Sequence, residues 1–211
     1  MWVVAEYSYD AADIEVLEFD VAVRKRPGMY FGVGLGNPKL PAKVLCAVAR
    51  HALHPAASVA KDHTLRCLIE ITSDSSFTVS MDQPHAWGVS GVPASGYFDS
   101  LLGPEWWQLA AAAVLCRRVT VEMWCAGRGW CQDLGGIRPL AVPQEFRPPE
   151  GSGTRVSYTF DPAYVGPHFV LPTDLEDLDL HGPNCPEPPG PGHVLIRDVR
   201  RGQTGQGMLH R

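Results

Sequence analysis

Apolar residues recur at helical spacing in one long central stretch of the chain. Asn37 and Pro38 precede this stretch, and an Asn followed by Pro is a typical helix start. The apolar positions then fall three or four residues apart to about residue 57, which predicts one long amphipathic helix. They are Leu40, Val44, Leu45, Val48, Ala49, Ala52 and Leu53.

Shorter stretches alternate between apolar and polar residues, as half-buried strands do. In residues 64–72 every second position from Leu65 to Ile71 is apolar. A glycine-containing turn at residues 126–129 separates two further stretches and indicates a hairpin. The predicted strands are residues 64–72, 77–81, 119–124, 130–134, 154–160 and 193–200.

The remaining segments complete the order of elements. Residues 18–26 predict a short helix that ends before Pro27, because proline disfavours the helical conformation of the preceding residue. Residues 104–118 predict an alanine-rich helix and residues 171–180 a weak acidic one. This order predicts an α/β (α+β) two-layer sandwich, a mixed and mostly antiparallel sheet with helices on one face. The other segments are an extended arm at 7–17, loops at 83–103 and 181–192, and a polar tail at 201–211.

Composition limits the classes of function. The chain has 211 residues, of which 45% are hydrophobic and 19% charged, which fits one domain at 1–211 with an ordered core at 7–200. The net charge of −5 argues against direct nucleic-acid binding. No apolar run approaches about 18 residues and no signal peptide is recognisable, so no membrane contact is predicted. The six cysteines form no C-x-x-C, which favours reduced thiols in the cytoplasm.

Residues 23–32 carry a distinctive string, V-R-K-R-P-G-M-Y-F-G. The string resembles the ATPase domain of the bacterial type II topoisomerase B subunits, DNA gyrase B and topoisomerase IV B, in the GHKL ATPase superfamily. Weaker similarity covers residues 7–10, 14–17, 153–156 and 196–202. The resemblance implies a GHKL (Bergerat-type) fold without the other parts of a topoisomerase, so we expect no topoisomerase activity from the chain by itself.

The long helix departs from the family at its catalytic positions. In active members it carries E-x-x-x-N, where Glu activates the attacking water and Asn binds magnesium. The resemblance places Ala47 at the Glu position and His51 at the Asn position. Alanine cannot accept a proton, and magnesium prefers oxygen ligands over histidine. We therefore expect no catalytic residue for ATP hydrolysis, because Ala47 replaces the general base, and no bound metal.

The adenine-recognition motif of the family, D-x-G-x-G, is partly retained. It aligns with residues 82–88, where Asp82 remains, both glycines are lost and Trp87 follows. In the family a Gly-Thr pair on a later strand supports the Asp. That pair is present here as Gly153 and Thr154.

The phosphate-binding loop of the family, G-x-H-G-x-G, is largely lost. It aligns with residues 103–108, of which only Gly103 matches. Glycine lets backbone N–H groups approach a phosphate closely. Glu105, Trp106 and Trp107 would instead repel a phosphate or fill its site. Whether the two indoles fill the space or line an open cavity stays open at this point.

These departures predict a pseudo-ATPase, a ligand-binding or regulatory protein that does not hydrolyse ATP. Asp82 and Thr154 would anchor a planar ring with donor and acceptor atoms. No cofactor is certain; an adenine nucleotide or nucleoside without magnesium is one candidate ligand, and another planar small molecule is the other. A protein partner, or a homodimer through residues 7–18, is equally open. The predicted ligand-binding residues are Asp82, Gly153, Thr154, Val156, His51 and Trp87.

Two alternatives remain open. In the first, the old nucleotide pocket is the active site of a small-molecule enzyme, with His51, His85 or Glu105 as acid or base. In the second, ATP binding and hydrolysis persist through substitutions that the motifs do not reveal. His51 and His54 could share a helix face, but the sequence offers no third ligand, so no metal site is predicted.

Overall fold

The computed structural model describes most of the central chain. The described residues are 16–54, 65–83, 85–88, 91–176, 178–180 and 193–200, with the backbone of 208–210. Several predictions therefore lie outside the described residues: most of the arm at 7–17, the loop at 181–192, residues 201–207 of the tail, and the end of the long helix beyond residue 54.

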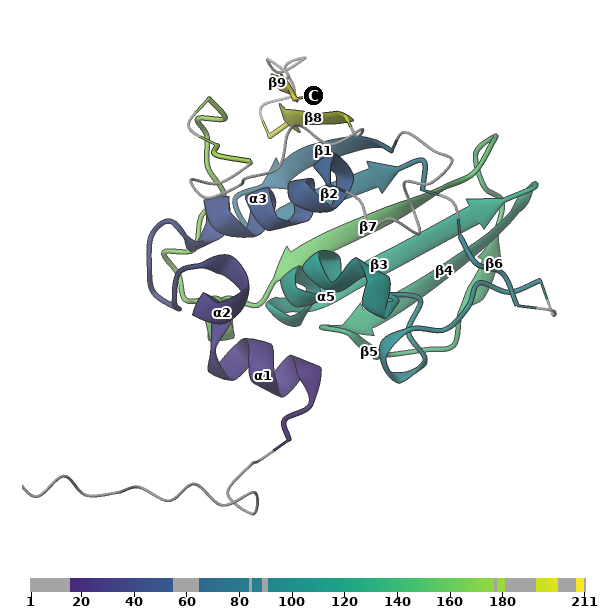
Figure 1. Ribbon diagram of the computed structural model, residues 1–211, viewed down its shortest axis with the longest axis horizontal. Helices are drawn as coiled ribbons and strands as arrows, with labels where there is room; N and C mark the ends of the chain where they lie inside the picture. Colours follow the sequence, from purple (N-terminus) through teal and green to yellow (C-terminus); the bar gives the residue numbers. More distant parts are fainter. Residues whose placement is uncertain are drawn as a thin grey trace, which may run out of the picture.

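The described strands form one nine-stranded sheet in the order β5-β4-β3-β7-β2-β1-β8-β9, and β6 pairs with β4 (Figure 1). Neighbouring strands are antiparallel except β1 and β8, which are parallel. The strands are β1 Arg66–Ser73, β2 Ser76–Met81, β3 Cys116–Cys125, β4 Arg128–Gly135, β5 Arg138–Pro139, β6 Gln144–Phe146, β7 Gly153–Phe160, β8 His193–Asp198 and β9 Met208–His210.

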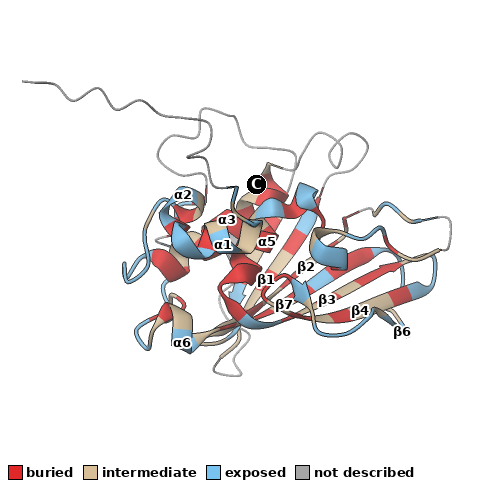
Figure 2. Cartoon of the chain, turned by 90° about the horizontal axis from the view of Figure 1, so that it is seen from below, coloured by how far each residue is buried: buried red, intermediate tan, exposed pale blue. Residues whose placement is uncertain are grey.

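The main helices lie on one side of the sheet, as Figures 1 and 2 show for α1, α2, α3 and α5. The structure thus confirms a mixed α+β architecture with a large, mostly antiparallel sheet. The helices are α1 Phe19–Lys25, α2 Pro27–Phe31, α3 Leu40–Leu53, α5 Trp107–Val114 and α6 Pro162–Val165, with 3-10 turns η2 Tyr97–Asp99 and η3 Pro104–Trp106.

Helix α3 is the predicted long helix, and its apolar stripe is buried against the sheet. Its start differs from the prediction by two residues. Lys39 occupies the N-cap position and Leu40 is the first helical residue. The Asn37 side chain accepts a hydrogen bond from the Lys39 backbone N–H at 2.9 Å, so Asn37 shapes the turn before the helix.

The string at residues 23–32 forms a corner of two short helices. Helix α1 ends just before Pro27, as predicted, and Pro27 then begins α2. Proline suits a first helical position because its missing N–H would have no helical partner there. Gly32 ends α2 with φ of 75°, a left-handed conformation that glycine adopts readily. Tyr30 contacts the ring of Phe19 edge-on, with ring centroids 5.8 Å apart, which ties the two helices together.

The strand predictions are confirmed in the centre of the sheet. Alternate residues of β1, β2 and β7 are buried, and the residues between them lie on the more open face. The hairpin between β3 and β4 turns through Ala126 and Gly127, with φ of 51° and 77°. Positive φ at both central residues is the geometry of a type I′ turn.

Other predicted elements are wrong. The helix expected at residues 104–118 splits into η3 and α5 and ends at Val114, because β3 begins at Cys116. The described part of residues 171–180 forms no helix, and its leucines are buried in irregular chain. The predicted tail contains β9, which pairs with β8. The short elements β5, β6 and α6 were not anticipated, because they span too few residues to show a period.

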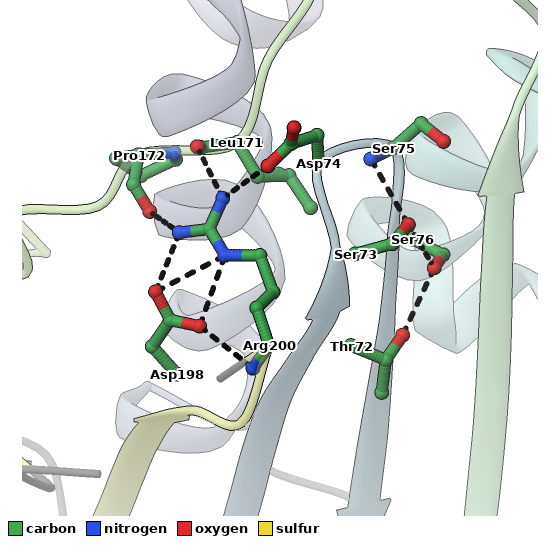
Figure 3. Close-up of polar contacts among 9 residues, drawn as sticks. All are labelled: Thr72, Ser73, Asp74, Ser75, Ser76, Leu171, Pro172, Asp198 and Arg200. Carbon is green, nitrogen blue, oxygen red and sulfur yellow. Dashed lines mark hydrogen bonds and ion pairs between the residues drawn. The ribbon is translucent and has the colours of Figure 1, made fainter. Parts of the chain in front are cut away.

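Arg200 binds part of this irregular path (Figure 3). Its guanidinium donates hydrogen bonds to the backbone carbonyls of Leu171 and Pro172, at 3.2 and 2.8 Å. It also pairs with the carboxylates of Asp198 and Asp74. We call these five residues the Arg200 cluster; they join the end of β8 to the β1–β2 turn.

Candidate functional site

The floor of the candidate site is a row of inward-facing residues that crosses the sheet near one end of its central strands. Thr154 of β7 lies at the centre of this row and is fully buried. Its neighbours in register are Met81 of β2 and Met123 of β3. The row continues to Cys67 on one side and Trp130 on the other. Residues of α3, η3 and the segment after β2 lie over this floor.

His51 of α3 points into the interior and binds Gln83. The two side chains are buried, and the His51 Nε2 lies 2.9 Å from the Gln83 Oε1. An amide oxygen only accepts, so the His51 Nε2–H is the donor. Burial lowers the pKa of His51, because the charged imidazolium loses its hydration. The imidazole is therefore neutral at neutral pH.

His85 forms a second polar pair with Thr154. The His85 Nε2 lies 3.1 Å from the backbone carbonyl oxygen of Gly153 and within hydrogen-bond distance of the Thr154 hydroxyl. Burial lowers the pKa of His85 to about 4. This imidazole too is neutral at neutral pH.

Trp106 of η3 lies against both histidines. Its ring centroid is 6.0 Å from that of His51 and 5.3 Å from that of His85. The side chain is 2% exposed, whereas that of Trp107 is 42% exposed. Trp106 therefore fills the interior of the site, and Trp107 lies at the surface. We call His51, Gln83, His85, Trp106 and Thr154 the histidine–tryptophan cluster.

Asp82 has a different environment from the one the resemblance implies. Residues Met81 and Gln83 on either side of it are buried, so the alternation of the strand turns Asp82 away from the row. Its carboxylate accepts the backbone N–H of Arg66 at 2.6 Å, which secures the start of β1. Thr154 lies opposite Met81 in the ladder and bonds to His85. Asp82 and Thr154, the predicted pair of anchors, thus make separate contacts.

The other predicted ligand residues are distributed around the cluster. Gly153 supplies the carbonyl for His85, and a Cβ at this position would lie 2.7 Å from the Trp124 ring, so packing requires glycine. Val156 is the next inward residue of β7 and belongs to the core. Trp87 is partly buried beside Pro93, and its indole N–H has no hydrogen-bond partner among the described residues.

The three candidate acid–base residues differ in burial. His51 and the partly buried His85 both contact Trp106, whereas Glu105 is exposed at η3, and its charge opposes the lowering of the pKa of His51. Ala47 is buried in α3, one helical turn before His51. The groups that meet in the interior are therefore neutral imidazoles, an amide and a hydroxyl. Such groups can hold an uncharged polar ring, but they offer no charge to an anion.

Gln83 is the one member of the cluster that the sequence analysis missed. The alternation Phe77, Val79, Met81 continues to position 83, so extending the strand period by one step would have found it.

No protein-family model matches the chain, and no curated protein matches it. In the parts of the chain that the structure describes, no helix has the length and apolar character needed to cross a membrane. Among the same residues, no three His, Cys, Asp or Glu side chains gather as a metal site would require.

Proposed function

We propose that the protein is a degenerate member of the GHKL, gyrase-B-like ATPase fold that binds a ligand or partner and does not hydrolyse ATP. The observation that carries the proposal is the buried indole of Trp106 against His51 and His85. The resemblance aligns this indole with the phosphate loop of the family. A bulky apolar side chain in that loop disfavours a triphosphate, which needs close backbone N–H groups.

Ala47 gives independent support. Its methyl group cannot take a proton from water, and the loss of a general base lowers a rate by roughly 100- to 10,000-fold. The neutral His51 one turn later has an imidazole nitrogen where the family has an oxygen ligand for magnesium.

The ligand that best suits the histidine–tryptophan cluster is an uncharged planar molecule, and an adenine nucleoside without magnesium is one candidate. A protein partner or a second copy of the chain remains the alternative partner. Direct nucleic-acid binding is not proposed, given the net charge of −5. We also propose a cytoplasmic location, supported by the free thiols of the described cysteines. The enzyme alternative has weaker support, because His51 is buried and hydrogen-bonded to Gln83, whereas Glu105 is exposed.

Phosphate release and thermal stability test the proposal directly. The full chain is incubated with ATP and magnesium, and we expect no phosphate release above the blank. Adenosine should raise the melting temperature at least as much as ATP with magnesium does. A larger, magnesium-dependent stabilisation by ATP would overturn the proposal, as would steady phosphate release that Thr154→Val abolishes.

A further inference from the structure

We propose that the basic surface at the corner of α1, α2 and α3 is a docking site, and that residues 1–15 of the same chain occupy it. The surface consists of Lys25, Arg26, Met29, Leu35 and Lys39, and we call it the basic corner. It shares no residue with the histidine–tryptophan cluster, so the inference does not depend on the proposed function.

The basic corner belongs to a stretch of the chain without a carboxylate. Residues 21–54 contain six Lys or Arg and no Asp or Glu, although the whole chain has a net charge of −5. Arg24 and Arg50 of this stretch are engaged, since each donates to a backbone carbonyl of a distant segment. Arg26 and Lys39 are exposed and form no ion pair with any residue that the structure describes. Their charges therefore attract an acidic segment.

Two large apolar side chains accompany these charges at the surface. Met29 of α2 is 74% exposed, and Leu35 of the turn between α2 and α3 is 48% exposed. The turn folds back onto α2, because a Cβ at Gly28 would lie only 3.6 Å from the backbone nitrogen of Gly34. Figure 1 shows α1, α2 and this turn together at one edge of the molecule. Apolar side chains beside cations suit a segment that carries both carboxylates and apolar residues.

Gly34 gives an independent indication of a docked backbone. A Cβ at this position would meet no atom within 4 Å, and its φ lies outside the left-handed region. The glycines on either side, Gly32 and Gly36, have φ of 75° and 82°, which explains them by conformation. Neither conformation nor packing within the fold requires glycine at position 34. A glycine in an exposed turn allows another backbone to approach closely.

Residues 1–15 have the complementary composition. They contain four carboxylates and no Lys or Arg. The carboxylates are Glu6, Asp10, Asp13 and Glu15, and the large apolar and aromatic residues are Trp2, Val3, Val4, Tyr7, Tyr9 and Ile14. Outside residues 21–54 the rest of the chain has more carboxylates than cations, so its net charge does not attract this segment.

The distance along the chain permits docking within one molecule. Val16, the first described residue, is 92% exposed and lies three positions before α1. Helix α1 has seven residues, so its end at the basic corner is about 10 Å from its start. The preceding segment, residues 1–15, reaches up to about 50 Å when extended. A short tether gives an effective concentration of about a millimolar, so weak contacts within the chain outcompete those of a second copy.

Charge reversal on both sides tests the contact in the full-length chain. The corner variant combines Arg26→Glu with Lys39→Glu, and the segment variant combines Asp10→Lys with Asp13→Lys. A fluorophore on the α-amino group of Met1 reports by its anisotropy whether the segment is docked. We expect each double variant to lower the ratio of docked to free segment about tenfold, because exposed ion pairs become like-charge contacts. The quadruple variant should restore the ratio to within about twofold of the wild-type value.

The matched control combines Arg117→Glu with Arg147→Glu. It makes the same change in net charge at exposed positions outside the basic corner, and it should leave the anisotropy unchanged. The corner variant should fold, because both of its positions are exposed and a carboxylate before α3 suits the helix dipole. A salt titration of the wild type needs no variant. High salt should lower its anisotropy to that of the corner variant, because salt screens exposed charges.

Three results would overturn the proposal. Equal anisotropy of the wild type and the corner variant would mean that the segment is not docked at these cations. A loss in both double variants without recovery in the quadruple variant would mean that the two sets of charges do not meet. A fall of the wild-type anisotropy on dilution over about two orders of magnitude would assign the basic corner to the segment of a second copy, since only that contact depends on protein concentration.

Discussion

The two ends of the central strands are held by opposite chemistry. At one end, the histidine–tryptophan cluster is buried except for the partly buried His85, and its members are neutral. At the other end, the Arg200 cluster joins a guanidinium to two carboxylates and two carbonyls close to the surface (Figure 3). Both clusters tie a strand end to an irregular segment, yet only the second uses charge.

The difference shows where this fold can tolerate ions. Arg200 keeps its charge because carboxylates face it and Asp74 remains 71% exposed to water. At the interior end burial outweighs the hydrogen bonds and the charge of Glu105, so the pKa of both histidines is lowered. A nucleoside triphosphate would bring several negative charges to the neutral end, where their desolvation would be uncompensated. The contrast therefore argues for an uncharged ligand at the interior end.

Removing the Trp106 indole should have the largest effect on stability of the changes compared here. Trp106→Ala should lower the free energy of unfolding by about 3–5 kcal/mol, because a buried indole is replaced by a cavity. Trp107→Ala should lower it by about 1 kcal/mol or less, because that ring is 42% exposed. Urea unfolding followed by circular dichroism measures both. Similar losses for the two variants would mean that Trp106 is not the filling of the neutral end.

Lowering the pH should have the next largest effect, a loss of folding stability through His85. In the unfolded chain His85 has a pKa near 6.5, and in the folded protein its pKa is about 4. Between these values the unfolded chain binds more protons, so stability falls as the pH falls from about 6.5 to 4 and is flat above 7. The loss assigned to His85 is about 3 kcal/mol, and His51 adds to it in the same direction.

Unfolding by urea at a series of pH values measures this loss. The matched variant is His85→Gln, which keeps a donor for the Gly153 carbonyl and cannot be protonated. Its stability should be flatter between pH 6.5 and 4 than that of the wild type. If the variant keeps the full wild-type slope, the acid sensitivity belongs to other groups and the neutral end is not its source.

How well the sequence predicted the two ends depends on how far apart the interacting residues lie along the chain. The alternation of apolar and polar residues in 64–72 and 77–81 was sufficient to predict β1 and β2, because the buried positions of a half-buried strand recur every two residues. Extending the same alternation by one step would have placed Gln83 inward and Asp82 outward, but the sequence analysis ended the strand at residue 81 and assigned Asp82 to the site from the aligned motif. A local period was therefore the better guide to that side chain than the aligned motif.

Long-range contacts could not be predicted in this way. His85 and Thr154 are 69 positions apart, and Arg200 and Asp74 are 126 apart. From the sequence, Trp106 could either fill the site or line it. Only the packing of η3 against α3 shows that the Trp106 side chain fills the site. The irregular chain found at 171–180, where a helix was expected, is likewise bound by a distant residue, since Arg200 donates to the carbonyls of Leu171 and Pro172.

Breaking the charged end should have a moderate effect. Arg200→Met removes hydrogen bonds to two carbonyls and leaves Asp198 without the guanidinium, so we expect a loss of about 2–3 kcal/mol. The control is Arg118→Met, which breaks an ion pair with Asp133 whose arginine is 65% exposed and should lose about 1 kcal/mol or less. Chemical unfolding compares the two. Equal losses would show that the Arg200 cluster is no more than a surface ion pair.

The smallest expected effect is that of a change at Asp82, and it decides whether this residue belongs to the candidate site. Asp82→Asn keeps an oxygen that can accept the Arg66 N–H, so the loss of stability should be about 1 kcal/mol or less. Because Asp82 faces away from the buried row, the change should also leave the rise in melting temperature caused by adenosine unchanged. A thermal-shift measurement on the variant with adenosine tests this. Loss of the adenosine effect with unchanged stability would return Asp82 to the site, as the resemblance first implied, and the neutral end would then contain an acidic anchor.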